Sequence, residues 1–207
     1  STSGKGLVVK DFSISDNTLM PDQEANIQVL IANYNKNPTE IETLEIFNEG
    51  ALNVTDKSCS SEDIKPAREG LIPQMECSWS IKAPSKDYVK GFESKPAPIK
   101  LRLAYETSFD TKEPLKINYK ELSDIENSGK TSVTNGNGVT EINVKGQTPT
   151  DKSNPNPLEF KITNVGSGRL NGSYEISYDP SDLLSDCPNE EEPVLENTAK
   201  FTCTPDT

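Results

Sequence analysis

Four cysteines are the residues of this sequence with the clearest chemistry, and their spacing favours disulfides. Cys59 and Cys77 lie 18 positions apart, and Cys187 and Cys203 lie 16 positions apart. A structural zinc site normally includes a close Cys-x-x-Cys pair, which neither spacing contains, so we do not expect zinc. Oxidised cysteines indicate an extracellular or cell-surface setting, or else the cytosol of a hyperthermophile.

Catalytic and metal chemistry finds little support in the remaining residues. The chain has no histidine, which excludes Ser-His-Asp and Cys-His catalysis, histidine metal sites and a histidine pH switch. Acidic residues gather near the C-terminus, namely Asp179, Asp182, Asp186, Glu190, Glu191 and Glu192. They could bind Ca²⁺ or act as glycosidase carboxylates, but they lack the spacing of a preformed calcium loop. We therefore predict no catalytic residue, no metal site and no cofactor.

Two sequons are candidate sites of N-glycosylation. They are Asn53-Val54-Thr55 and Asn171-Gly172-Ser173. Two sequons are no more than chance would give in a chain so rich in Asn, Ser and Thr. The prediction that Asn53 and Asn171 carry glycans therefore depends on the secreted interpretation, and the alternative is a plain polar surface asparagine.

An internal repeat organises the chain. Residues 27–33 (Ile-Gln-Val-Leu-Ile-Ala-Asn) and 158–164 (Leu-Glu-Phe-Lys-Ile-Thr-Asn) align at an offset of 131 positions. Both alternate apolar residues with others, as a β-strand with one buried face does. Each segment is followed by one of the two cysteine pairs, so we interpret the chain as two copies of one module. This symmetry favours the pairings Cys59–Cys77 and Cys187–Cys203 over the other two connectivities.

The polar, glycine-containing stretch 127–138 separates the two copies in this interpretation. We expect a first domain over residues 1–126, a linker over 127–138 and a second domain over 139–207. The alternative is that 127–138 is a long hairpin loop inside one domain. The formal charge is −6 before the linker, +1 within it and −7 after it, which sums to the −12 of the chain.

Short alternating segments separated by proline and glycine turns predict an all-β protein. In the first copy these segments are 7–14, 25–33, 43–47, 75–82, 99–105 and 115–119. They predict two tandem immunoglobulin-like antiparallel β-sandwiches, with Cys77 and Trp79 on one core face. Only four residues follow Cys203, so the second sandwich is expected to lack its last two strands. Either the natural chain continues, or another chain donates a strand.

The first 50 residues resemble the opening of CARDB-type modules, which are immunoglobulin-like repeats of bacterial and archaeal surface proteins. The resemblance rests on residues 6–14 (Gly-Leu-Val-Val-Lys-Asp-Phe-Ser-Ile), 20–29 and 32–35 (Ala-Asn-Tyr-Asn). In the second copy it is carried by residues 158–166. The disulfide loops and the weak strand at 139–144 depart from the family pattern. The resemblance implies adhesive, spacer or scaffold roles and transfers no catalytic residue.

These observations predict a non-catalytic, extracellular structural or adhesive module of a prokaryotic cell-surface or filament protein, archaeal in our interpretation. The strong negative charge argues against nucleic acid as a partner. Partners would be other copies of the chain or neighbouring surface proteins, with β-strand addition as one mode of contact. The alternative is an accessory module of a larger secreted enzyme or receptor that binds a glycan or a protein.

Overall fold

The structure is a computed structural model that is nearly all β, with 53% of residues in strands and 4% in helices, as the sequence predicts. It describes residues 6–48, 50–91, 94–166, 168–170, 184–185, 187 and 198–206. The chain divides into two compact units, unit 1 (Ser1–Ser108) and unit 2 (Phe109–Thr207). No helix of the described ranges is long and apolar enough to cross a membrane.

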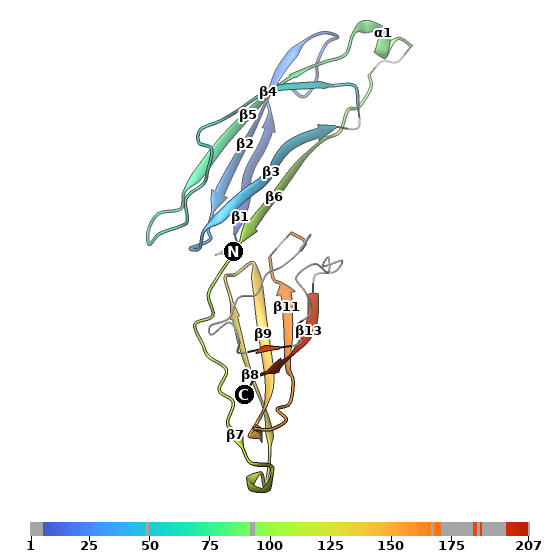
Figure 1. Ribbon diagram of the computed structural model, residues 1–207. Helices are drawn as coiled ribbons and strands as arrows, with labels where there is room; N and C mark the ends of the chain where they lie inside the picture. The colour runs from blue at the N-terminus through green and yellow to red at the C-terminus, as the bar shows by residue number, and fades with distance from the viewer. Residues whose placement is uncertain are drawn as a thin grey trace. The chain divides into compact units, whose positions relative to one another are not determined.

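Unit 1 is a sandwich of two antiparallel sheets (Figure 1). Its strands are β1 (Leu7–Ile14), β2 (Glu24–Asn33), β3 (Thr39–Asn48), β4 (Asn53–Cys59), β5 (Gln74–Lys82) and β6 (Ile99–Thr107), with a short helix α1 (Lys86–Val89) between β5 and β6. One sheet has the order β1-β2-β5-β4, and the other pairs β3 with β6. This order matches strands A-B-E-D and C-F of an immunoglobulin sandwich, whose second sheet normally continues into a strand G.

The core of unit 1 follows directly from the alternation in β2 and β5. Ile27, Val29 and Ile31 of β2 are almost completely buried, as are the residues paired with them in β5 (Trp79, Cys77 and Met75). Each large apolar side chain buried in this way contributes roughly 1.5–3 kcal/mol to folding. The residues between them are mostly polar and face solvent, which explains how a chain of low hydrophobicity forms a stable sheet.

Unit 2 is built on a five-stranded sheet of order β12-β13-β11-β9-β8. Its elements are β7 (Tyr119–Lys120), the 3-10 helix η1 (Leu122–Asp124), β8 (Gly129–Gly136), β9 (Thr140–Thr148), β10 (Thr150–Asp151), β11 (Leu158–Asn164), β12 (Leu184–Ser185) and β13 (Thr198–Pro205). The segment before β7 packs against this sheet at Gly146 of β9. A Cβ placed on Gly146 would lie only 2.7 Å from Cδ1 of Ile117, which shows how closely that segment approaches β9.

Each unit contains its own four-stranded sheet of the same strand order, as the internal repeat predicts. Strands β9, β11, β13 and β12 of unit 2 correspond in order to β1, β2, β5 and β4 of unit 1. Asn33 and Asn164, which align at the repeat offset, form equivalent hydrogen bonds. The Oδ1 atom of Asn33 accepts from the N–H of Asn35, and that of Asn164 accepts from Gly166, both at 2.9 Å. Each side-chain amide also donates to a backbone carbonyl.

The structure corrects the expected domain boundaries. Residues 127–138 are not a linker, because strand β8 occupies 129–136 and pairs with β9 along its length. Residues 137–139 form the hairpin turn between them, with Gly138 at φ 85°. A polar edge strand followed by Asn-Gly has the composition of a linker, which explains the error. The second unit begins at Phe109 instead of 139.

The expected last strand of the first sandwich also belongs elsewhere. Leu115 and Ile117 pack near Gly146 in unit 2, and Tyr119 pairs with Thr150 in a short parallel ladder of β7 with β10. Alternation correctly indicated an extended apolar segment but not the sheet that it joins. Among the described residues of unit 2, the β3-β6 sheet of unit 1 has no counterpart.

Candidate functional site

The disulfide of unit 1 joins two neighbouring strands of one sheet. Cys59 and Cys77 lie directly opposite each other in the register of β4 and β5, with their Cα atoms 4.1 Å apart. Cys77 is completely buried. The disulfide of an antibody domain links two sheets, whereas this one fastens the edge strand β4 to its own sheet. It therefore opposes the peeling of that edge.

Unit 2 repeats this arrangement with Cys187 and Cys203, whose Cα atoms are 4.5 Å apart. Cys203 lies on β13, and Cys187 follows the short edge strand β12. Both predicted pairings are therefore confirmed. Two disulfides in one chain indicate an oxidising, extracellular environment.

A lysine beside the first disulfide ties the edge strand to the second sheet. Lys57 lies in an irregular part of β4, where Asp56 has φ 53° and the pairing with β5 shifts. Its Nζ atom donates to the carbonyl of Leu44 on β3 at 2.7 Å and lies 5.9 Å from the centre of the Trp79 ring. This bulged, charged and disulfide-bonded edge is poorly suited to pairing with another strand.

Asn53, the first candidate glycosylation site, lies at the start of β4 with its side chain exposed. Thr55 of the same sequon is also exposed, whereas Val54 between them is half-buried in contact with the core. The Thr55 hydroxyl donates to the Asp56 carboxylate at 3.0 Å. The two sequon side chains that define the motif are therefore accessible on one face. The second candidate, Asn171, lies outside the described residues.

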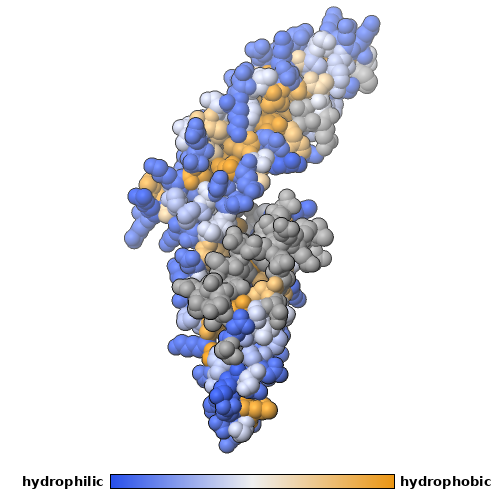
Figure 2. Space-filling model, viewed as in Figure 1, coloured by the Kyte–Doolittle hydropathy of each residue, from blue (hydrophilic) through white to orange (hydrophobic). Residues whose placement is uncertain are grey.

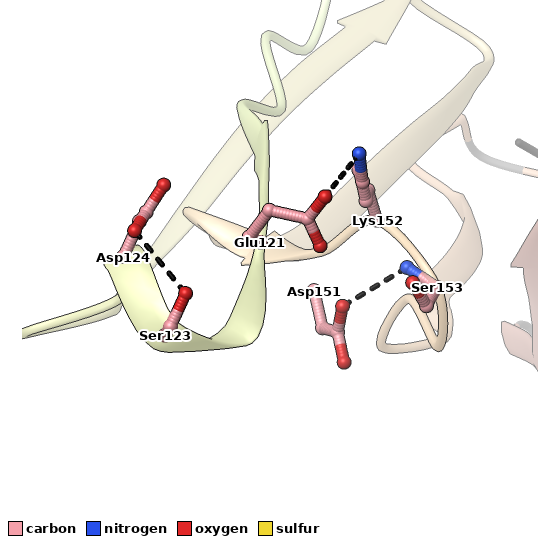
Figure 3. Close-up of polar contacts among 6 residues, drawn as sticks. All are labelled: Glu121, Ser123, Asp124, Asp151, Lys152 and Ser153. Atoms are coloured by element: carbon pink, nitrogen blue, oxygen red, sulfur yellow. Dashed lines mark hydrogen bonds and ion pairs between the residues drawn. The ribbon is translucent and has the colours of Figure 1, made fainter.

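The candidate calcium ligands near the C-terminus, Asp179, Asp182, Asp186 and Glu190–Glu192, also lie outside the described residues. Other carboxylates gather around β7, η1 and β10 (Figure 3). There Glu121 forms an ion pair with Lys152, the Asp151 carboxylate accepts from the Ser153 N–H, and Asp124 accepts from the Ser123 hydroxyl. No group of three or more potential metal-binding side chains occurs in the described ranges. These carboxylates serve as local hydrogen-bond and ion-pair partners.

Unit 2 has a polar depression of about 330 Å³. Its lining residues are Lys130, Lys145, Gly146, Gln147, Asn156, Pro157, Glu159 and Thr202. Ammonium, amide and carboxylate groups of this kind can bind a polar ligand by hydrogen bonds. These residues come from four separate segments of the sequence, so no local motif predicted the depression.

A strip of apolar side chains along β1 and β6 of unit 1 was also not anticipated. Val9 and Phe12 of β1 are 37% and 40% exposed, although their partners in β2, Ile31 and Val29, are completely buried. At the other end of the strip, burial raises the pKa of Tyr105 on β6, and a hydrogen bond with the Leu7 backbone partly opposes that rise. Alternation indicates which face of a strand is apolar, but not whether another element covers it.

Comparison with known proteins finds no matching family model, no matching curated protein and no matching solved structure.

Proposed function

We propose that this chain is a non-catalytic structural or adhesive module of a prokaryotic cell surface or its filaments. The observation that carries the proposal is the tandem repetition of one sheet whose edge is fastened by a disulfide. An extracellular module that separates or connects other domains must hold its edge strands in its sheets where intracellular chaperones are absent. An in-sheet disulfide meets this need in each unit.

The bulges in three edge strands of unit 1 support the same role. The pairing of β1 is interrupted by a bulge at Lys10, that of β3 by a bulge at Glu42, and that of β4 by the irregularity at Asp56 and Lys57. Bulges and charges on edge strands prevent uncontrolled sheet-to-sheet association. The resemblance of the opening residues to CARDB-type modules supports a scaffold or spacer role on a prokaryotic surface.

Glycosylation of Asn53 is part of this proposal. The exposed side chains of Asn53 and Thr55 leave room for a transferase and for a glycan at the β4 edge. Peptide mapping of the protein purified from its native cells should show the peptide that contains Asn53 with the added mass of a glycan. An unmodified Asn53 peptide as the only species would refute it.

Labelling of native cells tests the proposed location. Antibodies raised against the chain should label intact cells, and protease added outside should remove that signal. Labelling that requires permeabilised cells would overturn the cell-surface role. The alternative, a glycan-binding accessory module, predicts reproducible binding on a glycan array, with Lys145→Ala and Asn156→Ala in the polar depression of unit 2 reducing it. A role confined to structure or protein contact predicts no such binding.

A further inference from the structure

Strand β6 corresponds to a central strand of the immunoglobulin topology, but its core-facing side chains are only half-buried, as is usual for an edge strand. Strand F, which it matches in order, normally lies between strands C and G. Here β6 pairs only with β3 in the described part of unit 1. Its core-facing residues Ile99, Leu101, Leu103 and Tyr105 are all only half-buried. The corresponding residues of the central strands β2 and β5 are buried.

The facing part of β1 is uncovered in the same way. Val9 and Phe12 point to the core side of their sheet, because each is paired with a fully buried residue of β2. We call Val9, Phe12, Ile99, Leu101 and Leu103 the open strip. Apolar surface is visible along unit 1 in Figure 2. A strand added beside β6 would occupy the place of strand G, which lies over strand A in this fold, and would cover the open strip.

The edge of β6 also differs from the other edges of unit 1. The bulges in β1, β3 and β4 interrupt their ladders, whereas β6 runs without a bulge from Ile99 to Thr107. The extra residue at the single irregularity of the β3-β6 pair, Glu42, belongs to β3. A regular strand beside an apolar strip has the features that allow β-strand addition.

Unit 2 has an extended segment packed next to the equivalent surface. The registers of the two sheets place Val9 at the position of Ile142 and Phe12 at the position of Val144, which lies two residues before Gly146. Ile142 is only 9% exposed, compared with 37% for Val9. The extended segment that contains Leu115 and Ile117, with apolar residues at alternate positions, packs at Gly146. Unit 2 therefore has an extended segment packed at the end of this surface next to Val144, whereas the described part of unit 1 shows no such segment at the open strip.

Charge indicates what the added strand should carry on its outer face. Strand β6 has two basic residues, Lys100 and Arg102, and one acidic residue, Glu106, which gives it a net charge of +1 in a chain of net charge −12. The guanidinium of Arg102 lies on the exposed face, 5.3 Å from the ring of Phe47, and forms an ion pair with Glu45 of β3 at 3.2 Å. With 62% of its side chain exposed, Arg102 can also contact an acidic residue on its other side. Acidic residues on a neighbouring strand would lie opposite this end of β6, where cross-strand pairs of opposite charge are favourable.

We propose that unit 1 accepts, beside β6, an extended segment of another polypeptide that has apolar residues at alternate positions and acidic residues between them. The main chain of this segment would pair with β6, and its apolar side chains would fill the open strip. This inference rests on the proposed function, because it names the kind of contact through which a surface module would join its neighbours.

A labelled probe peptide of about ten residues, alternating valine with glutamate and threonine, tests the proposal with the full chain. The peptide should bind measurably by fluorescence anisotropy and should slow amide hydrogen exchange in β6 and not in β4 or β8. A peptide of the same composition with its valines in one block is the matched control and should bind at least about tenfold more weakly. Equal binding of the two peptides, no binding, or protection at a different edge would overturn the proposal.

Two variants sharpen the test. Phe12→Asp places a charge in the open strip and should weaken binding at least about tenfold, whereas Leu71→Asp, at an exposed loop residue, should leave it unchanged. Arg102→Glu, on the solvent face, should shift preference towards a probe with lysine in place of glutamate, and this variant addresses the case in which Phe12→Asp does not fold. An unchanged preference for the glutamate probe over the lysine probe would refute the proposal that acidic residues of the added segment lie opposite Arg102. Surface labelling of cells is independent of these results, so the two proposals can fail separately.

Discussion

Removal of the Cys59–Cys77 disulfide should destabilise unit 1 strongly, and we predict the size of the effect for Cys59→Ala/Cys77→Ala. The bond closes a loop with a sequence separation of 18 residues, for which loop-closure entropy gives about 3 kcal/mol. Cys77 is completely buried, so the loss of its sulfur removes packing worth roughly a further 1 kcal/mol. We therefore expect a loss of about 3–4 kcal/mol, a large share of the roughly 5–15 kcal/mol that stabilises a typical domain.

The single tryptophan of the chain makes this measurement specific to unit 1. Trp79 is 4% exposed and lies two residues after Cys77, in the same core cluster. Urea unfolding followed by its fluorescence should show the midpoint falling by about 1–3 M, given the usual dependence of stability on urea for small domains. The variant Cys187→Ala/Cys203→Ala is the matched control, because its disulfide closes a similar loop in unit 2.

The control should leave the Trp79 transition in place while lowering a second transition followed by circular dichroism. A fall below about 1 kcal/mol in the first variant would refute the reasoning that loop closure dominates the stability of unit 1. An equal shift of the Trp79 transition in both variants would show that the two units do not unfold separately.

Other predictions concern glycine, asparagine and tyrosine. A Cβ at Gly136 would lie 2.7 Å from the Thr140 carbonyl oxygen, so Gly136→Ala should cost about 1–3 kcal/mol in urea unfolding, whereas Gly129→Ala, with open space around it, should change stability by less than about 0.5 kcal/mol. Asn33→Ala should cost about 2–4 kcal/mol, because it leaves the Asn35 N–H and a backbone carbonyl without their partner; a cost below about 1 kcal/mol would contradict this account. The pKa of the Tyr105 hydroxyl is raised in the folded state, so as pH rises the unfolded chain loses this proton first. The contribution of Tyr105 to the free energy of unfolding is therefore complete below pH 10 and falls as pH rises above 10. Tyr105→Phe should reduce this fall in urea unfolding measured at alkaline pH, and an unchanged pH dependence would show that another group causes the fall.

The strands and the disulfide pairs were predictable because they depend on local patterns. Strand β1 has the predicted bounds 7–14, and β2 differs from the predicted 25–33 by one residue. Alternation with period two identifies a strand with one buried face wherever it occurs. The cysteine pairing followed from repeat symmetry, since both pairs come after equivalent strands. The accessibility of Asn53, by contrast, required the position of β4 at the edge of its sheet.

Local sequence patterns did not predict which strand or sheet each segment packs against. Residues 115–119 alternate as a closing strand of the first sandwich would, yet they pack in unit 2, because nothing in a local pattern specifies which of two apolar sheet faces a segment will cover. Residues 129–136 looked like a linker, because an edge strand with two largely exposed faces needs few apolar residues. The exposure of Val9 and Phe12 could not be predicted for the same reason, because apolar residues at buried positions of a strand have the same sequence pattern.

The sequence by itself determined that the chain is all β, that one strand pattern occurs twice, and which cysteines pair. These properties follow from alternation, repetition and covalent spacing, which are all written along the chain. Only the tertiary structure decided where one unit ends and the next begins, which edges are bulged, and which apolar strip lies uncovered beside β6. Those properties depend on contacts between segments distant in sequence, where several pairings satisfy the same local pattern and packing selects one of them.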